Sequence, residues 1–408
     1  IRKIALIETP GTLAREDFAG AIRGMWQADG HASGKVLIAQ GTTLSTFDPA
    51  TNTDGALTGT IAGTDWGDFA FTETEGFGLF NGQPYVSDGT TIRRASDGLQ
   101  DDPNLVIGST PANVATGAFD YSIAGVAYSK GRVATAVLAA AARPTVVSTR
   151  VRIGYVTASK SDGTFTFGTT SLAAANTTVA YTDSATNTGF ADLLTDADVA
   201  SFTSVDALGQ RGLLTFGPRF AFTDVLNVTS ISALNYYTAE SSPDTLIAGR
   251  VVGELYYLFG SQTIEPWAQT GNSDDPFSLQ PGMTQQVGCF CRDGIIRADN
   301  TLFFIDEAGN PRRLGQGSSP ILNPEDPWVS DLLRLAGAEN IRGIMYQDRA
   351  HVFVGWRTPI GTVIYDVLTQ QWHTRGTLNS DTWRYTAIVT AGTRTFVADA
   401  DGIFDELS

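Results

Sequence analysis

The sequence is short of the residues on which metal sites, disulfide scaffolds and many catalytic centres depend. Its 408 residues include only two cysteines and three histidines. Two cysteines are too few for a disulfide scaffold, and His31, His351 and His373 are too scattered to complete a metal site beside Cys289 and Cys291. Because alternate residues of a strand share a face, we expect the two thiols to lie side by side on a strand, buried as small apolar groups.

Lysine is also scarce, and the charge balance is strongly acidic. The chain has 27 Lys and Arg residues against 43 Asp and Glu residues, which gives a formal net charge of -16. Tight binding of nucleic acid through its phosphates needs clustered basic residues that release counterions, so the composition argues against such a protein. An acidic surplus keeps a protein soluble. A second interpretation is an acidic wall beside which a duplex slides without sticking.

Several chemical signatures are missing as well. The sequence has no run of about eighteen apolar residues, so we expect no membrane-spanning segment. The Gly-x-Ser-x-Gly elbow, the glycine-rich phosphate loop and the Ser-x-Asp-x-Gly-x-x-Trp boxes of sialidase-like propellers are all absent. We therefore expect a protein that is not an enzyme, with no catalytic, cofactor-binding or metal-binding residues. Ser161–Gly163 and Asp399–Gly402 resemble fragments of calcium loops, but such Asp-Gly pairs are far more often hairpin turns.

The sequence does contain many short apolar strands separated by Gly, Asn, Asp and Pro. They recur in pairs: Gly78–Phe80 and Tyr85–Ser87, for example, flank Asn81-Gly82, a strong hairpin turn. The first strands of seven such pairs contain Leu37, Leu79, Leu213, Leu255, Leu302, Val352 and Phe396. Five of the six steps between these positions are roughly 40–50 residues, the length of one four-stranded propeller blade.

We therefore predict an all-β fold, a β-propeller-like assembly of short antiparallel sheets. Short strands with one apolar face must bury that face against another sheet. Radial repetition does this and leaves only short, protected edges. A sandwich or two stacked barrels would explain the strands equally well, but not the repeating step.

The remaining step is about three times as long and spans a change in composition. Between Asn113 and Phe202 the chain is rich in Ala, Thr and Ser. This stretch could hold two degenerate blades or one insertion, and we favour an inserted β-rich subdomain because extra loop length costs little entropy. The predicted domains are residues 1–112 with the N-terminal blades, 113–202 as the inserted subdomain, and 203–408 with the remaining blades and a short helix near 325–336.

The helix prediction depends on its end signals. Asn323–Trp328 offers an N-cap residue, early prolines and acids in the first turn, and Gly337 ends the helix. Its apolar residues would pack on the core or form a docking face for a neighbouring subunit. Arg15–Met25 has weaker helical spacing and is a second candidate. Eight aromatic residues would pack between blades or anchor a subunit interface: Tyr236, Tyr237, Tyr256, Tyr257, Trp267, Trp356, Trp372 and Trp383.

The most specific pattern lies in Ala239–Leu314. It contains, in this order, an AE-x-x-PD motif, the strand pair Leu255–Trp267, a G-x-x-x-x-PF turn and an FID-x-x-G-N-P turn. These landmarks resemble the packaged-DNA stabilization proteins of short-tailed (podovirus-type) phages, also called tail hub or nozzle proteins. The resemblance covers roughly Ser204 to Asp405, and Glu8–Thr12 is similar to the opening of that family.

The resemblance implies a structural virion protein of the phage tail or neck, made in the host cytoplasm. Such proteins form a homo-oligomeric ring, a hexamer, below the portal and adaptor proteins. They extend the DNA channel, help to retain packaged DNA until ejection, and offer docking places for tail fibres or spikes and for a plug or needle. Double-stranded DNA passes through them without sequence-specific binding. Neither a cofactor nor a reaction belongs to this role.

A different class of function is the alternative. The chain could instead be a carbohydrate-binding or glycan-hydrolysing β-propeller, such as a receptor-binding tail protein, because propellers also host such enzymes. Asp and Glu are plentiful enough to supply the paired carboxylates of glycoside cleavage. Binding to a glycan array, abolished by aromatic substitution, would favour this alternative, whereas neighbouring portal and terminase genes would favour the hub.

Overall fold

The computed structural model describes, with side chains, residues 11–73, 75–95, 202–228, 231, 235–239, 244–273, 275–315, 319–322 and 326–407, and, as backbone, residue 318 and the strands within 104–183. The chain divides into two units. One comprises Ile1–Ile92, Asp196–Val228 and Leu234–Ser408, and the other comprises Arg93–Thr195 and Thr229–Ala233. The first unit is a seven-bladed β-propeller of small antiparallel sheets, which confirms the predicted fold class.

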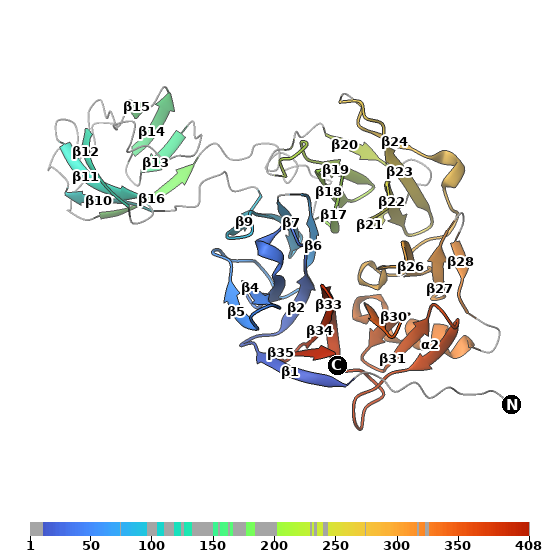
Figure 1. The fold of residues 1–408 in the computed structure, drawn as a ribbon. Helices are drawn as coiled ribbons and strands as arrows, with labels where there is room; N and C mark the ends of the chain where they lie inside the picture. The colour runs from blue at the N-terminus through green and yellow to red at the C-terminus, as the bar shows by residue number, and fades with distance from the viewer. Residues whose placement is uncertain are drawn as a thin grey trace. The chain divides into compact units, whose positions relative to one another are not determined.

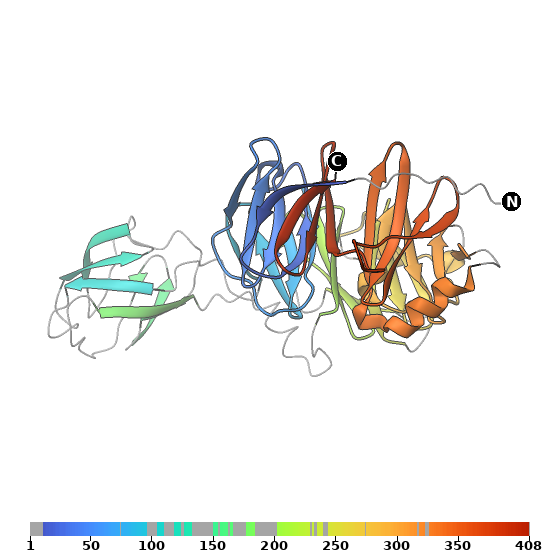
Figure 2. The same ribbon diagram turned by 90° about the horizontal axis from the view of Figure 1, so that it is seen from below.

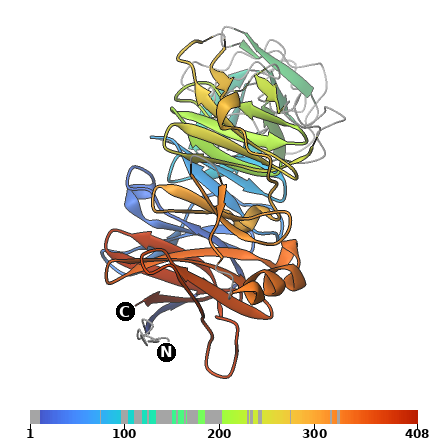
Figure 3. The ribbon, with the colours of Figure 1, turned by 90° about the vertical axis from the view of Figure 1, so that its right-hand side faces the viewer.

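The blades are four-stranded sheets arranged around a central axis (Figure 1) and seen from the side in Figures 2 and 3. Blades 1 to 3 are β2 (Ile22–Trp26), β3 (Val36–Gln40), β4 (Thr43–Asp48) and β5 (Thr53–Ala56); β6 (Asp68–Phe71), β7 (Gly76–Phe80), β8 (Gln83–Ser87) and β9 (Ile92–Arg94); and β17 (Ser204–Leu208), β18 (Arg211–Phe216), β19 (Arg219–Phe222) and β20 (Tyr236–Thr238). In each of them the strands pair in chain order.

Blades 4 to 6 repeat this order. They are β21 (Leu246–Val252), β22 (Leu255–Gly260), β23 (Ile264–Gln269) and β24 (Phe277–Leu279); β25 (Ile296–Ala298), β26 (Thr301–Ile305), β27 (Pro311–Leu314) and β28 (Ser318–Pro320); and β29 (Arg342–Asp348), β30 (His351–Thr358), β31 (Gly361–Asp366) and β32 (Gln371–Thr374). The first strand of each blade is innermost, next to the axis (Figure 1).

Blade 7 closes the propeller with strands from both ends of the described chain. It consists of β33 (Tyr385–Ala391), β34 (Arg394–Asp399), β35 (Ile403–Leu407) and β1 (Thr12–Asp17), and β1 pairs antiparallel with β35. Arg15 and Arg394 donate through Nε to Glu406 at 2.7 and 2.8 Å. Strand β1 is therefore held by both ladder hydrogen bonds and ion pairs. It joins the last blade of the propeller to the chain segment that leads into blade 1.

Apolar clusters fill the spaces between neighbouring blades. Phe47 of blade 1 contacts Phe396 and Phe404 of blade 7. Trp356 of blade 6 is fully buried and donates through its indole Nε1 to the Gly294 carbonyl oxygen, at 2.8 Å, beside blade 5. Tyr256 is also fully buried, and it packs among residues of blades 3 and 4. These contacts confirm the predicted packing between blades for Trp356 and Tyr256, whereas Tyr236 is 38% exposed.

The structure contains the hairpin turn that Asn81-Gly82 predicts in blade 2. Asn81 and Gly82 have φ values of 52° and 67°, and they join β7 to β8. Both residues adopt the left-handed conformation that an Asn-Gly pair tolerates in a two-residue hairpin.

Within the described residues one α-helix is present, α2 (Pro327–Ala336), near the predicted 325–336. Its N-cap is Asp326, whereas Asn323 lies outside the described residues, and Gly337 with a φ of 82° follows the last turn. Short 3-10 turns are η1 (Ala32–Gly34), η3 (Pro281–Met283), η4 (Arg292–Gly294) and η5 (Ala338–Asn340). The second predicted helix, Arg15–Met25, is wrong: these residues belong to β1 and β2, because pairing with β35 and β3 outweighs a weak helical spacing.

The two cysteines are buried, as predicted, but they do not share a strand. Cys289 forms an isolated bridge with Asp306, and Cys291 directly precedes η4. Their side chains belong to different apolar clusters, between blades 4 and 5 and between blades 5 and 6. The expected arrangement on one strand face is wrong because the chain passes here from one blade to the next.

The second unit contains one seven-stranded antiparallel sheet, described as backbone, with the strand order β12-β11-β10-β16-β13-β14-β15. Its strands are β10 (Asn104–Ser109), β11 (Ala118–Ile123), β12 (Val126–Arg132), β13 (Arg150–Ile153), β14 (Val156–Ser161), β15 (Thr164–Phe165) and β16 (Thr177–Asp183). The sheet is inserted in the sequence between β9 and β17. The predicted domain boundaries at 113 and 202 stay a prediction.

None of the helices among the described residues has both the length and the apolar character that crossing a bilayer requires.

Candidate functional site

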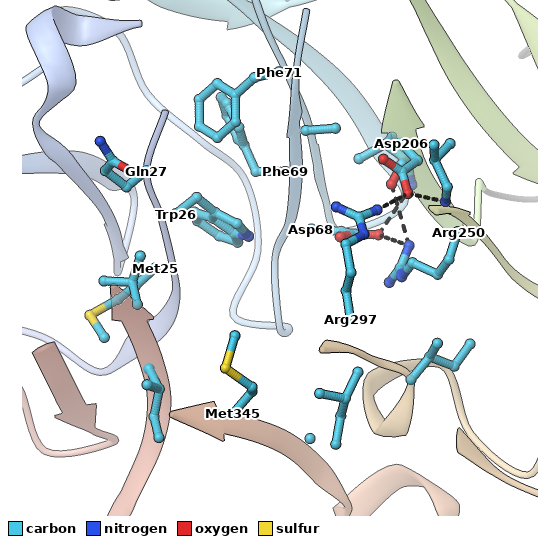
Figure 4. Close-up of a pocket in the computed structure, with 18 of the residues that line it drawn as sticks. Met25, Trp26, Gln27, Asp68, Phe69, Phe71, Asp206, Arg250, Arg297 and Met345 are labelled. Carbon is cyan, nitrogen blue, oxygen red and sulfur yellow. Dashed lines mark hydrogen bonds and ion pairs between the residues drawn. The ribbon is translucent and has the colours of Figure 1, made fainter. Parts of the chain in front are cut away.

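The innermost strands of all seven blades surround a cavity of about 590 Å³ on the propeller axis, which we call the central cavity (Figure 4). Its lining residues are Met25–Gln27, Asp68–Phe71, Val205–Ala207, Arg250 and Val251, Ile295–Arg297, Gly343–Met345 and Ile388–Thr390. Each blade presents its first strand to the axis. The repeat therefore brings together segments that are far apart in the sequence.

Two ion pairs line one wall of the central cavity (Figure 4). Arg250 of blade 4 donates through Nη1 to Oδ2 of Asp68 in blade 2, at 2.8 Å. Arg297 of blade 5 donates through Nη2 to Oδ2 of Asp206 in blade 3, at 2.7 Å. Each pair skips the blade between its partners. The side chains thus connect blades that are not consecutive in the ring.

The backbone also stabilises the two carboxylates. Asp206 accepts hydrogen bonds from the Ala207 and Val251 amides at 2.8 and 2.7 Å, and Asp68 accepts one from the Val205 amide at 3.2 Å. Burial disfavours the charge of Arg250, but the carboxylates of Asp68 and Asp206 outweigh it and raise its pKa. The guanidinium is therefore a fixed cation.

A second layer of arginines bridges the axis beside these pairs. Arg292, in η4 before blade 5, donates to the carbonyl oxygens of Thr203 at 3.2 Å and Trp66 at 3.1 Å. It also donates through Nε to Asp293, at 2.6 Å. Arg342 of blade 6 contacts Asp293 at 3.3 Å and lies over the Trp66 ring, 5.1 Å from its centroid. Residues of blades 5 and 6 thus reach the opposite side of the propeller.

These bridges close one end of the central cavity. Trp66, Thr203 and Arg292 all lie at the starts of innermost strands, just before β6, β17 and β25. Toward the strand ends, Arg297 and Thr390 are exposed. The central cavity is therefore a cup, crossed by arginines at one end and open at the other.

The histidines do not converge on this cup. His31 is buried against Phe69 and Phe71, and burial lowers its pKa, so its imidazole is neutral. His351 contacts Asp366 at 2.7 Å in blade 6, and His373 lies on β32 of the same blade. Across the part of the chain that the structure describes, no group of three or more His, Cys, Asp or Glu side chains is placed to hold a metal ion.

The acidic fragments were predicted to be turns. Asp399 accepts hydrogen bonds through Oδ1 from the amides of Asp401 and Ile403, both at 2.9 Å, and Gly402 has a φ of 98°. This carboxylate is thus used inside the β34–β35 hairpin, and the turn prediction is confirmed there. Asp162 and Gly163 of the other fragment lie outside the described residues.

The charged groups beside the axis were not predicted from the sequence. A signal was present: Asp206, Arg250 and Arg297 are single charged residues within otherwise uncharged strands, SVDAL, LIAGRVV and IRA. An isolated charge in a buried strand needs a partner. The partner is not predictable from the strand itself, because it comes from a blade that is not adjacent.

Comparisons with known proteins bear on both units, because the matched residues include most of the second unit as well as part of the propeller. A family model described as bacteriophage P22 Gp10, beta-propeller, matches residues 112–313, which include blades 3 and 4 and most of blade 5. No curated protein matches the chain by sequence. Among solved structures, the computationally designed protein Ika8 is similar with a TM-score of 0.41 and 11% identity, over 97% of this chain and 98% of that chain. That similarity is too weak to bear on function.

Proposed function

Because this chain belongs to the family of phage proteins that stabilise packaged DNA, we propose that it is a tail hub, or nozzle, which extends the DNA channel and helps to retain the genome until ejection. The family match over residues 112–313 is the observation that carries this proposal. The family is one of structural phage proteins, so the role depends on shape and assembly, and no reaction is part of it.

The geometry of the central cavity bears on where a DNA channel can lie in such a protein. The major groove of B-DNA alone is about 12 Å wide. Arg292 bridges one end of the propeller axis through the Trp66 and Thr203 carbonyl oxygens, and the Arg250–Asp68 and Arg297–Asp206 pairs occupy one wall of the central cavity. A duplex has no path through a single chain. We infer that the DNA channel is built between copies of the chain, around an axis separate from that of the propeller.

The assembly we propose is a homo-oligomeric ring, a hexamer by resemblance, below the portal and adaptor proteins in the virion. The net charge of -16 supports a lumen that repels phosphates and lets DNA pass without sequence-specific binding. Tail fibres or spikes and a plug or needle would dock on the ring. The protein would be made in the host cytoplasm before assembly.

Native mass spectrometry of the purified chain, alone and with its adaptor protein, tests the ring. We expect a closed oligomer of one stoichiometry, formed by the chain alone or on addition of the adaptor, and the adaptor alone is the control. A chain that stays monomeric at high concentration with the adaptor present would contradict the proposal. A map of the intact particle in which this chain is absent from neck and tail would do the same.

The carbohydrate-binding alternative stays a hypothesis. It differs from the hub in its ligand, and a glycan array separates the two functions. Saturable binding to a defined glycan by the monomeric chain, with no ring formed, would favour the alternative.

A further inference from the structure

The central cavity has two walls of different chemistry. Trp26, Phe69 and Phe71 of blades 1 and 2 lie on one side, and the four charged residues lie on the other (Figure 4). Trp26 and Phe71 are partly exposed, whereas Phe69 is buried behind them. The volume of about 590 Å³ falls within the roughly 300–1,000 Å³ of typical small-molecule sites. A few polar groups facing an apolar wall are also typical of such sites.

The carboxylates and the guanidinium groups of the two ion pairs differ in how far their hydrogen-bonding capacity is satisfied. Asp206 accepts from two backbone amides and from Arg297, and Asp68 accepts from the Val205 amide and from Arg250. These carboxylates are well supplied with donors. A cationic ligand would gain little from them.

The guanidinium groups of Arg250 and Arg297, by contrast, have N–H donors that are not used in these ion pairs. Arg297 uses only Nη2, toward Asp206, and 54% of its side chain is exposed. Arg250 donates only through Nη1, so its Nε and Nη2 have no hydrogen-bond partner among the described residues. In Arg297, Nε and Nη1 likewise have no partner among these residues. A guanidinium has five N–H donors in a planar fork that matches a carboxylate. The unsatisfied polar groups of the cup are therefore donors.

We propose that the central cavity binds a small amphipathic organic acid, with its carboxylate on Arg297 and its flat apolar body against Trp26 and Phe71. The closed end of the cup limits how deep the ligand reaches, and the open end admits it. The carboxylate could belong to a free acid or to the C-terminal aromatic residue of a peptide. This site does not depend on the proposed role as a tail hub, because it lies within one chain.

Isothermal titration calorimetry with 2-naphthoate tests the site, and 2-naphthamide, which has the same shape without the charge, is the control ligand. We expect one 2-naphthoate per chain and much weaker binding of the amide. Arg297→Gln should weaken naphthoate binding at least about tenfold, because it removes the charged donors that face the carboxylate. Thr390→Trp, at the exposed rim of the cup, should also weaken binding by obstructing entry.

Arg349→Gln is the matched control variant, because Arg349 is 72% exposed and lies in the turn after β29, outside the lining of the central cavity. It should leave naphthoate affinity unchanged. The proposal is overturned if naphthoate and naphthamide bind equally, if Thr390→Trp leaves the affinity unchanged, or if Arg349→Gln weakens it as much as Arg297→Gln does. Should Arg297→Gln fail to fold, as seen by thermal unfolding, Thr390→Trp and the ligand pair still decide the matter.

A second titration distinguishes the source of the carboxylate. The peptide Gly-Gly-Phe with a free C-terminus is compared with its C-terminal amide. Tighter binding of the free-acid peptide than of 2-naphthoate supports a chain terminus as the ligand, and the reverse order supports a free acid. Equal binding of the peptide and its amide would overturn the role given to Arg297.

Discussion

At the scale of single residues, arginine suits the axis of this propeller better than lysine does. The guanidinium is a planar fork with five donors, whereas the lysine ammonium is a compact point charge. Arg292 uses this fork to reach two carbonyl oxygens, of Trp66 and Thr203, while its Nε bonds Asp293. One ammonium group cannot satisfy three acceptors that lie in such different directions. The preference for arginine on the axis therefore has a geometric cause.

The first prediction concerns this bridge. Arg292→Lys should lower the free energy of unfolding by about 1–3 kcal/mol, because the substitution keeps the charge but leaves the carbonyl oxygen of Trp66 or Thr203 without its guanidinium donor. Urea unfolding followed by tryptophan fluorescence measures the difference. Arg349→Lys, at an exposed turn, is the control and should stay within about 0.5 kcal/mol of the wild type. Equal stability of the two variants would show that the bridge across the axis contributes nothing.

Residue-scale features were predictable where the cause was local. The Asp399–Gly402 turn and the burial of Cys289 follow from residue type and immediate neighbours. The bridge from Arg292 to Trp66 does not, because it joins positions 226 residues apart that meet only after the ring has closed. A single sequence gives the charge of Arg292 but not its partner.

At the scale of elements, β1 is the strand whose position depends most on the rest of the chain. It pairs with β35 and contributes Arg15 to Glu406, which Arg394 also contacts. The hydrogen bond from Arg394, against the opposing effect of burial and together with Arg15, lowers the pKa of Glu406 from 4.5 to about 2. The ion pairs that hold β1 against β35 thus depend on the charge of the Glu406 carboxyl group.

The second prediction uses that shift. A carboxyl group whose pKa is lower in the folded state adds stability above its unfolded value, and this stability is lost as the pH falls toward the folded value. Glu406→Gln should therefore cost about 1–2 kcal/mol at neutral pH, allowing for partial solvent screening, and the cost should vanish as the pH falls from about 4.5 to about 2. Urea unfolding at a series of pH values measures it.

The control for this prediction is Glu254→Gln. Glu254 is exposed in the turn between β21 and β22. Its substitution should have little effect at any pH. A cost of Glu406→Gln that is the same at pH 7 and pH 2 would contradict an electrostatic origin and would point to packing instead.

Elements were predictable when their signals were continuous in the sequence. The helix α2 was found from its prolines and Gly337, and the β7–β8 hairpin from Asn81-Gly82. The segment Arg15–Met25 was misassigned because β1 has a mixed polar sequence, TLARED, and is almost entirely exposed. Its strand conformation comes from pairing with β35, almost four hundred residues away. Local propensity carries no information about such a partner.

At the scale of the whole molecule, a repeating step predicted the propeller although its blades share no motif. The step depends on the length of four short strands and their turns, and this length is set by geometry and not by particular residues. The blade that closes the ring was not apparent, because it combines β1 with β33, β34 and β35. The repeating step predicts the blade, but it does not predict the β1–β35 pairing that closes the ring.

The last prediction concerns DNA. A chain with net charge -16 should show no saturable binding to a short duplex at micromolar protein and moderate salt, by fluorescence anisotropy. The double variant Asp54→Lys with Glu254→Lys, at two exposed positions, should bind more than the wild type does, and added salt should abolish this gain. Saturable wild-type binding that falls steeply with salt would contradict the prediction. Such binding would mean that basic groups gather on one surface despite the acidic total, and a channel formed by these chains would then hold DNA by attraction and not by confinement.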